Sequence, residues 1–229
     1  MRAVFFTIIS LILISCSKEN TEPVSSENTG RLYYPAKTGI TLYYDVTEIN
    51  IDRRVDIFDT TIYELKEYFE SEFTDQTGEQ NLRIEQYKRF QGDSVWQFYR
   101  TSYVMNGKTT IERVDDNIRI VNINFPLKIN KKWNGNAKNN LTEKEFTITG
   151  INATEQINNL SYNNNVLIIV QEDVENMIEK FYSVEKYAKN TGLIYKEIIN
   201  IEELEPLPGT PWQNRINRGT IFIQKRKEL

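Results

Sequence analysis

The stretch "GITLYYDVTEINI" (residues 39–51) alternates apolar and polar side chains with a period of two. One parity holds Ile40, Leu42, Tyr44 and Val46, and the other holds Thr41, Tyr43, Asp45 and Thr47. Because neighbouring side chains of a β-strand point to opposite faces, this pattern predicts a strand with one face in a core and the other in water.

The same period recurs along most of the chain after residue 31, in "NIRIVNINF" (117–125), "EKEFTITGI" (143–151), "NVLIIVQ" (165–171) and "GLIYKEIINI" (192–201). "SVWQFYRTSYVM" (94–105) carries apolar side chains on both parities, which predicts a strand buried on both faces for part of its length. Many short strands predict a mainly β fold: a single antiparallel sheet domain, either a curved sheet or a half-open barrel, with at most one short helix.

Residues 61–74 allow two interpretations. Ile62, Leu65, Phe69 and Phe73 recur near helical spacing, whereas Tyr63, Leu65, Phe69 and Phe73 share the parity of a strand. The strand is favoured because no capping box or C-terminal glycine marks the ends of a helix. Asp59 before Thr60 keeps the helix open as an alternative.

The N-terminus has the make-up of a secretory signal. Arg2 precedes an apolar run from Ala3 to Ile14, and small Ser15 precedes Cys16, the single cysteine. The run is shorter than the roughly 18 residues of a membrane-spanning helix. "Leu13-Ile14-Ser15-Cys16" resembles the lipobox of bacterial lipoproteins. The resemblance implies cleavage after residue 15 and a diacylglycerol on Cys16, with two or three acyl chains such as palmitate holding the protein durably. The alternative is an ordinary cleaved signal with an incidental cysteine.

Residues 16–30 then form the lipidated cysteine and a flexible tether, and residues 31–229 form the β domain. A flexible coil of this length reaches about 20 Å. Lys18 and Glu19 resemble the surface-export signal of some Gram-negative lipoproteins, and solvated linker charges are the alternative. The domain could therefore face either side of the outer membrane.

Three blocks together resemble an uncharacterised family of Gram-negative envelope lipoproteins: "LRIEQYKRF" (82–90), "FPLKINKKWNGNAKN" (125–139) and "EKFYSVEKYAKNTGLIYKE" (179–197). The family has no assigned activity that could be transferred. As structure, the third block reads as a hairpin around "KNTG", since Asn190 and Gly192 suit positive φ. In the second block Trp133 can cover a core, and Gly135 with its asparagine neighbours can supply turn conformations.

Composition removes several classes of function. The chain has no histidine, and its cysteine is the expected lipid attachment point, so histidine- and thiol-based catalysis and disulfides are excluded. With 28 basic and 32 acidic side chains spread along the chain, nucleic-acid binding is not expected. No calcium-loop motif is present, and neither a metal nor another cofactor is expected.

Two kinds of candidate site remain. Carboxylates that could flank a scissile bond are Asp115, Asp116, Glu172, Asp173 and Glu175, which keeps open a hydrolase acting on polysaccharide or peptide. Aromatic side chains are abundant, and Trp96, Trp133 and Trp212 are the candidate ligand contacts. Trp212 ends the proline-rich stretch "EPLPGTPW" (205–212), which could form the lip of a pocket or plug one end of a barrel.

The leading hypothesis is therefore a lipid-anchored protein of the cell envelope, attached to the outer membrane, and not an enzyme. It would be a binding or assembly component that recognises a glycan, a lipid or a partner protein.

Overall fold

The computed structural model describes residues 30–228. The signal peptide, Cys16, Lys18, Glu19 and nearly all of the tether lie outside these residues, so their roles stay predictions. No helix within residues 30–228 is long and apolar enough to cross a membrane.

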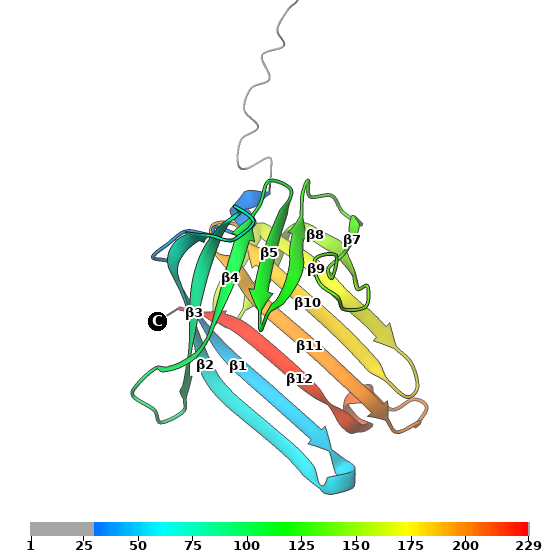
Figure 1. The fold of residues 1–229 in the computed structure, drawn as a ribbon. Coiled ribbons are helices and arrows are strands. Elements are labelled where there is room, and N and C mark those ends of the chain that lie inside the picture. Colours follow the sequence, from blue (N-terminus) through cyan, green and yellow to red (C-terminus); the bar gives the residue numbers. More distant parts are fainter. Residues whose placement is uncertain (1–29, 229) are drawn as a thin grey trace, which may run out of the picture.

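Twelve antiparallel strands form one sheet with the order β6-β5-β4-β3-β2-β1-β12-β11-β10-β9-β8-β7 (Figure 1). In chain order they are β1 (Thr41–Asp52), β2 (Ile57–Thr74), β3 (Gln80–Phe90), β4 (Gln97–Asn106), β5 (Thr110–Asp115), β6 (Ile118–Asn124), β7 (Lys132–Asn134), β8 (Glu145–Ile157), β9 (Leu160–Glu175), β10 (Lys180–Ala188), β11 (Gly192–Leu204) and β12 (Ile216–Lys227). The helical turns in residues 30–228 are short 3-10 helices, namely η1 (Arg31–Tyr33), η2 (Arg53–Val55) and η3 (Trp212–Asn214). The predicted fold class is confirmed.

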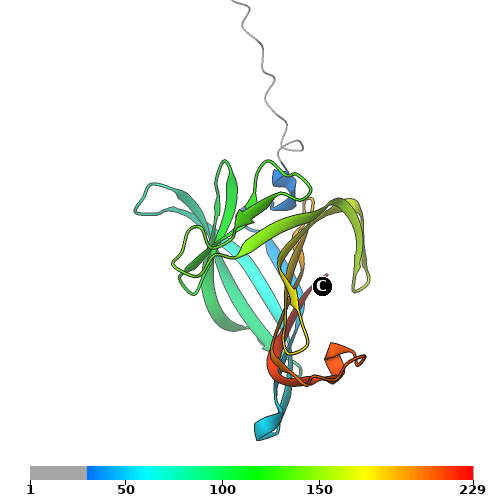
Figure 2. The same ribbon diagram turned by 90° about the vertical axis from the view of Figure 1, so that its right-hand side faces the viewer.

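The two edge strands, β6 and β7, meet and nearly close the sheet into a barrel (Figures 1 and 2). At this seam the Val121 amide donates to the Gly135 carbonyl at 2.9 Å, and the Trp133 indole N–H donates to the Val121 carbonyl at 2.8 Å. Pairing the edges in this way satisfies backbone groups that an open sheet would leave exposed. We call the result a half-open barrel, because the longer strands extend beyond the part that closes.

A short N-terminal segment closes one end of the half-open barrel. Tyr33 and Tyr34, in and just after η1, are buried in the main core. The Tyr33 hydroxyl donates to Asn152 Oδ1 at 2.8 Å, and the Asn190 amide donates to the Leu32 carbonyl at 2.7 Å. These contacts fix η1 across what we call the closed end.

The β8–β9 hairpin bends back over the outer face of the sheet (Figure 2). Several register shifts interrupt the pairing of the two strands, as expected where bulges bend a ribbon. At the hairpin turn Asn158 Nδ2 donates to Asp45 Oδ2 at 3.3 Å and to the Arg226 carbonyl at 3.1 Å. Beneath the hairpin lies a second apolar cluster that includes Ile157, Tyr162 and Ile194.

Two expectations for local structure are confirmed. Residues 61–74 lie in β2, where the buried side chains alternate from Tyr63 to Phe69, so the helical alternative was wrong. "KNTG" connects β10 and β11 as a hairpin, with positive φ at Asn190 (62°) and Gly192 (89°).

Burial of "SVWQFYRTSYVM" on both faces holds only at its end, where Val104 and Met105 are both buried. Its start is exposed, with 67% of Val95 and 59% of Phe98 accessible, because β5 pairs with β4 only from Tyr103 onward. One other expectation was wrong. Gly135 does not have a positive φ. It is needed for close packing instead, since a Cβ at this position would overlap the buried ring of Phe146.

We expect Gly135→Ala to lower the free energy of unfolding by about 1–3 kcal/mol through overpacking at the seam. The measurement is urea denaturation of the single variant and of Gly135→Ala combined with Phe146→Leu, beside Phe146→Leu alone. Gly135→Ala should lower the free energy of unfolding by a smaller amount in the Phe146→Leu background, because the ring that the alanine would overlap is absent there. An equal cost in both backgrounds would show that the glycine is not required for this packing.

Candidate functional site

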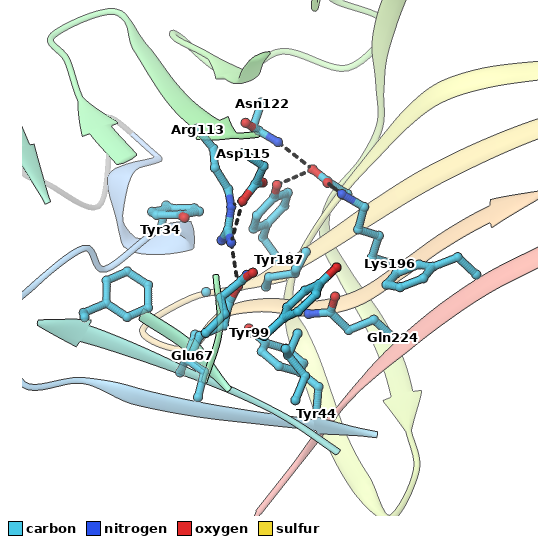
Figure 3. A pocket seen from close by; sticks show the side chains of 18 of the residues that line it. Tyr34, Tyr44, Glu67, Tyr99, Arg113, Asp115, Asn122, Tyr187, Lys196 and Gln224 are labelled. Atoms are coloured by element: carbon cyan, nitrogen blue, oxygen red, sulfur yellow. Dashed lines mark hydrogen bonds and ion pairs between the residues drawn. The ribbon is translucent and has the colours of Figure 1, made fainter. Parts of the chain in front are cut away.

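The inside of the half-open barrel contains a cavity of about 280 Å³ (Figure 3). Most strands of the sheet contribute to its wall, because inward-facing positions of neighbouring strands converge on the axis of a curved sheet. Apolar side chains form part of the wall, including Leu42, Leu65, Phe69 and Phe222. Next to the closed end, the rings of Tyr34 and Tyr187 pack with their centroids 5.9 Å apart.

An ion network crosses the cavity between strands that are not neighbours in the sheet. Arg113 on β5 contacts Glu67 on β2 at 2.6 Å and Asp115 at 2.8 Å. Gln86 Nε2 donates to the same Glu67 oxygen at 2.6 Å. Burial alone would raise the pKa of Asp115, but the charge and hydrogen bonds of Arg113, with further help from Arg100, lower it to about 2. Asp115 is therefore ionised at neutral pH.

A second network centres on Glu185 of β10, whose side chain is 3% exposed. The carboxylate contacts Lys196 Nζ at 3.0 Å and accepts hydrogen bonds from Asn122 Nδ2, at 3.0 Å, and from the Tyr187 hydroxyl. Burial opposes ionisation, but Lys196 and these hydrogen bonds outweigh it and lower the pKa of Glu185. Since Asn122 lies on β6 and Glu185 lies on β10, this network joins strands from the two halves of the sheet (Figure 3).

Three tyrosines of the cavity wall are neutral hydrogen-bonding groups. Burial raises the pKa of Tyr34 to about 12, and it raises the pKa values of Tyr44 and Tyr187 well above their usual range. The Tyr44 hydroxyl is buried and has no hydrogen-bond partner within the described residues. Buried polar groups are nearly always hydrogen-bonded, so this hydroxyl requires an explanation.

The register of the strands places these polar groups on the inside. Glu67 is opposite Leu42, Tyr44 is opposite Leu65, and Lys196 is opposite Gln224, so charged and apolar residues share the inner parity. In residues 63–69 the buried positions are Tyr63, Leu65, Glu67 and Phe69. A carboxylate on the buried parity of a strand was the available sequence signal. Tyr44, Arg113, Glu185 and Lys196 were not among the site residues predicted from the sequence.

None of the three candidate tryptophans lines the cavity. Trp133 is buried at the seam against Phe146, with ring centroids 5.8 Å apart. Trp96 packs on Tyr43, with Arg89 4.6 Å from its ring centroid. Trp212 lies against a small cluster that includes Leu204, so "EPLPGTPW" does not form the lip of this cavity.

The candidate carboxylates are mostly outside the cavity as well. Glu172 pairs with Lys144 at 2.7 Å, and Glu175 pairs with Lys180 at 2.5 Å. Asp173 is exposed on β9, and Asp116 is exposed in the β5–β6 turn. Only Asp115 of this set contributes to the cavity wall. In residues 30–228 no cluster of three or more acidic, histidine or cysteine side chains is arranged to hold a metal ion.

No protein-family model matches the chain, and no curated protein matches it. Among solved structures, one similar chain is a protein of Bacteroides fragilis NCTC 9343 that is thought to be exported and has a YmcC-like fold. The two chains are 10% identical, the alignment covers 85% of this chain and 98% of the other, and the TM-score is 0.35. Similarity at this level assigns neither a family nor a function.

The low pKa of Asp115 makes stability depend on pH. Its folded pKa lies below the value of about 4 expected in the unfolded chain, so its contribution is present at neutral pH and is lost as the pH falls from about 5 to about 2. We expect Asp115→Asn to lower the free energy of unfolding at pH 7 by about 1–2 kcal/mol, after allowance for partial solvent screening, and to flatten this acid dependence.

Urea denaturation at pH 7 and pH 3 measures both effects. Asp173→Asn is the matched control, since Asp173 is exposed on β9, and it should keep the wild-type profile. An unchanged acid profile in Asp115→Asn would rule out the stabilising ion pair with Arg113.

Proposed function

We propose that the protein is a lipid-anchored component of the cell envelope that binds a small ligand in the cavity of its half-open barrel without reacting with it. The buried Tyr44 hydroxyl in the cavity wall, which has no partner among the described residues, carries this proposal. A ligand that hydrogen-bonds to this group would remove the cost of burying it, about 1–3 kcal/mol.

The shape and rigidity of the cavity support a binding role. Its volume of about 280 Å³ is just below the usual range for ligand pockets, which suits a small ligand or the end of a larger one. Arg113 holds Glu67 and Asp115 in place before any ligand arrives. Preorganised polar groups lose little conformational entropy on binding, which favours affinity.

A carboxylate-dependent hydrolase has less support. Such an enzyme needs one carboxyl group that is protonated near neutral pH, as a general acid. In the cavity, nearby cations lower the pKa values of both Asp115 and Glu185, which keeps them ionised. Ionised carboxylates can accept hydrogen bonds from a ligand but cannot act as general acids, so the electrostatics of the cavity favour ligand binding over acid catalysis.

Attachment to the outer membrane through Cys16 remains the best interpretation of the N-terminal sequence. The described chain begins at Gly30, next to η1, so a tether from Cys16 would join the domain at its closed end. A ligand could then enter the cavity without first passing the anchor.

Native mass spectrometry of the protein purified from its own host tests ligand binding. We expect a retained extra mass at low collision energy that is lost in Ile198→Trp, because Ile198 lines the cavity and the larger ring fills it. Ile223→Trp is the matched control, since Ile223 belongs to β12 but does not line the cavity, and it should keep the extra mass. Absence of the mass from the wild type, or its retention in Ile198→Trp, would refute the proposal.

The anchor has a separate test. Cys16→Ala should abolish labelling by radioactive palmitate and release the protein from the membrane fraction. Protease treatment of intact and lysed cells then assigns the side of the membrane. Digestion in intact cells indicates the cell surface, and protection until lysis indicates the periplasm. Membrane retention of Cys16→Ala would refute lipid anchoring.

A further inference from the structure

We infer that the ligand of the cavity is a neutral sugar residue at the end of a glycan, not an acyl chain and not an acidic group. This inference rests on the proposed function and adds the chemical class of the ligand.

The first observation is the composition of the wall. Of the residues that line the cavity, 11 are polar or charged, 5 are tyrosines and 8 are apolar or glycine. Sugars present hydroxyl groups along their edges and C–H groups on their faces, so they bind where hydrogen-bonding side chains lie beside aromatic rings. The side chains of Gln86, Asn122 and Gln224 offer both donors and acceptors.

The second observation is the cost of an apolar occupant. An acyl chain would exclude water from the wall while leaving the Tyr44 hydroxyl unpaired and the partly exposed carboxylates of Glu48 and Asp115 without solvent. Burying polar groups without new hydrogen bonds opposes binding, and a site built around polar groups rejects ligands that lack them. A hydroxyl-rich ligand replaces the hydrogen bonds of the displaced water.

The third observation is the balance of charge. The wall holds four carboxylates, Glu48, Glu67, Asp115 and Glu185, against the three cations Arg100, Arg113 and Lys196. Each cation already lies in an ion pair: Arg113 with Glu67, Lys196 with Glu185, and Arg100 with Asp116 at 2.7 Å. An acidic sugar or a phosphate would have to break one of these pairs, so a neutral ligand fits best.

The fourth observation concerns the rim. Tyr99 lines the cavity and is 44% exposed, and Lys88 Nζ lies 3.8 Å from its ring centroid. The exposed part of this rigid aromatic ring can pack against a sugar that follows the inserted one. The cavity has room for little more than the end of a chain, so the rest of the glycan would continue into solvent past Tyr99.

Isothermal titration calorimetry of the purified full chain tests the inference. The probes are neutral oligosaccharides of glucose, mannose and galactose, with oligogalacturonate as the acidic probe and palmitate as the apolar one. We expect at least one neutral oligosaccharide to bind more tightly than either of the other two probes. Tyr44→Phe should weaken that binding about tenfold, because it removes one hydrogen bond to the ligand.

Tyr33→Phe is the matched control. Tyr33 is as buried as Tyr44, but its hydroxyl bonds to Asn152 and it does not line the cavity. Tyr33→Phe should lower the thermal midpoint and keep the affinity, whereas Tyr44→Phe should keep or raise the thermal midpoint and lose affinity. These opposite effects on affinity and on the thermal midpoint distinguish a tyrosine that contacts the ligand from one that only stabilises the fold.

The outcomes distinguish the two proposals. Tighter binding of palmitate or oligogalacturonate, or no heat with every neutral probe, overturns the inference about the sugar. The retained mass in native mass spectrometry then decides whether the proposed function survives. Unchanged affinity in Tyr44→Phe also overturns the inference, since it removes the contact from which the site was deduced.

Discussion

The Arg113 guanidinium, held between Glu67 and Asp115, joins β5 to β2 across the inside of the curved sheet. In the sheet β3 and β4 lie between these two strands, so β5 and β2 share no backbone hydrogen bonds. The ion pair therefore connects two strands that face each other across the curved sheet. Removal of one partner from a buried ion pair typically costs about 3–5 kcal/mol. Glu185 on β10 and Asn122 on β6 join the two halves of the sheet in the same way. Polar contacts inside the barrel therefore support its curvature, in addition to the hydrogen bonds at the seam.

These contacts also explain why the interior is not filled by apolar side chains. The main core includes Tyr33, Tyr34 and Leu42 at the closed end and continues along the inner face of the sheet. The charged residues of the two networks lie among these apolar side chains, since Glu67 is opposite Leu42, and the cavity lies beside them. Close packing would require these charges to be desolvated completely, which is unfavourable. A polar, preorganised cavity therefore arises from the same ion pairs and hydrogen bonds that support the curvature of the sheet.

The sequence was sufficient for the strands but not for the site. Alternation in residues 39–51 and the turn at "KNTG" depend on local side-chain period and backbone preference, so both were predictable. The position of a tryptophan is harder to predict, because it depends on partners from other parts of the chain. Trp96 packs on Tyr43 of β1, whereas Trp133 lies at the seam and donates to the Val121 carbonyl of β6. Arg113 and Glu67 are far apart in sequence, and their contact exists only because the sheet curves. Glu67 and Gln86, each on the buried parity of its strand, were local signs of a polar interior.

The most direct measurement is a crystal structure of the protein soaked with the neutral oligosaccharide that gives the largest heat. A hydroxyl-bearing ring within hydrogen-bond distance of the Tyr44 hydroxyl, with the Arg113 and Glu185 ion pairs unchanged, is the expected result. A cavity that holds only water, with the Tyr44 hydroxyl turned to a protein partner, would contradict a ligand-binding role for the half-open barrel.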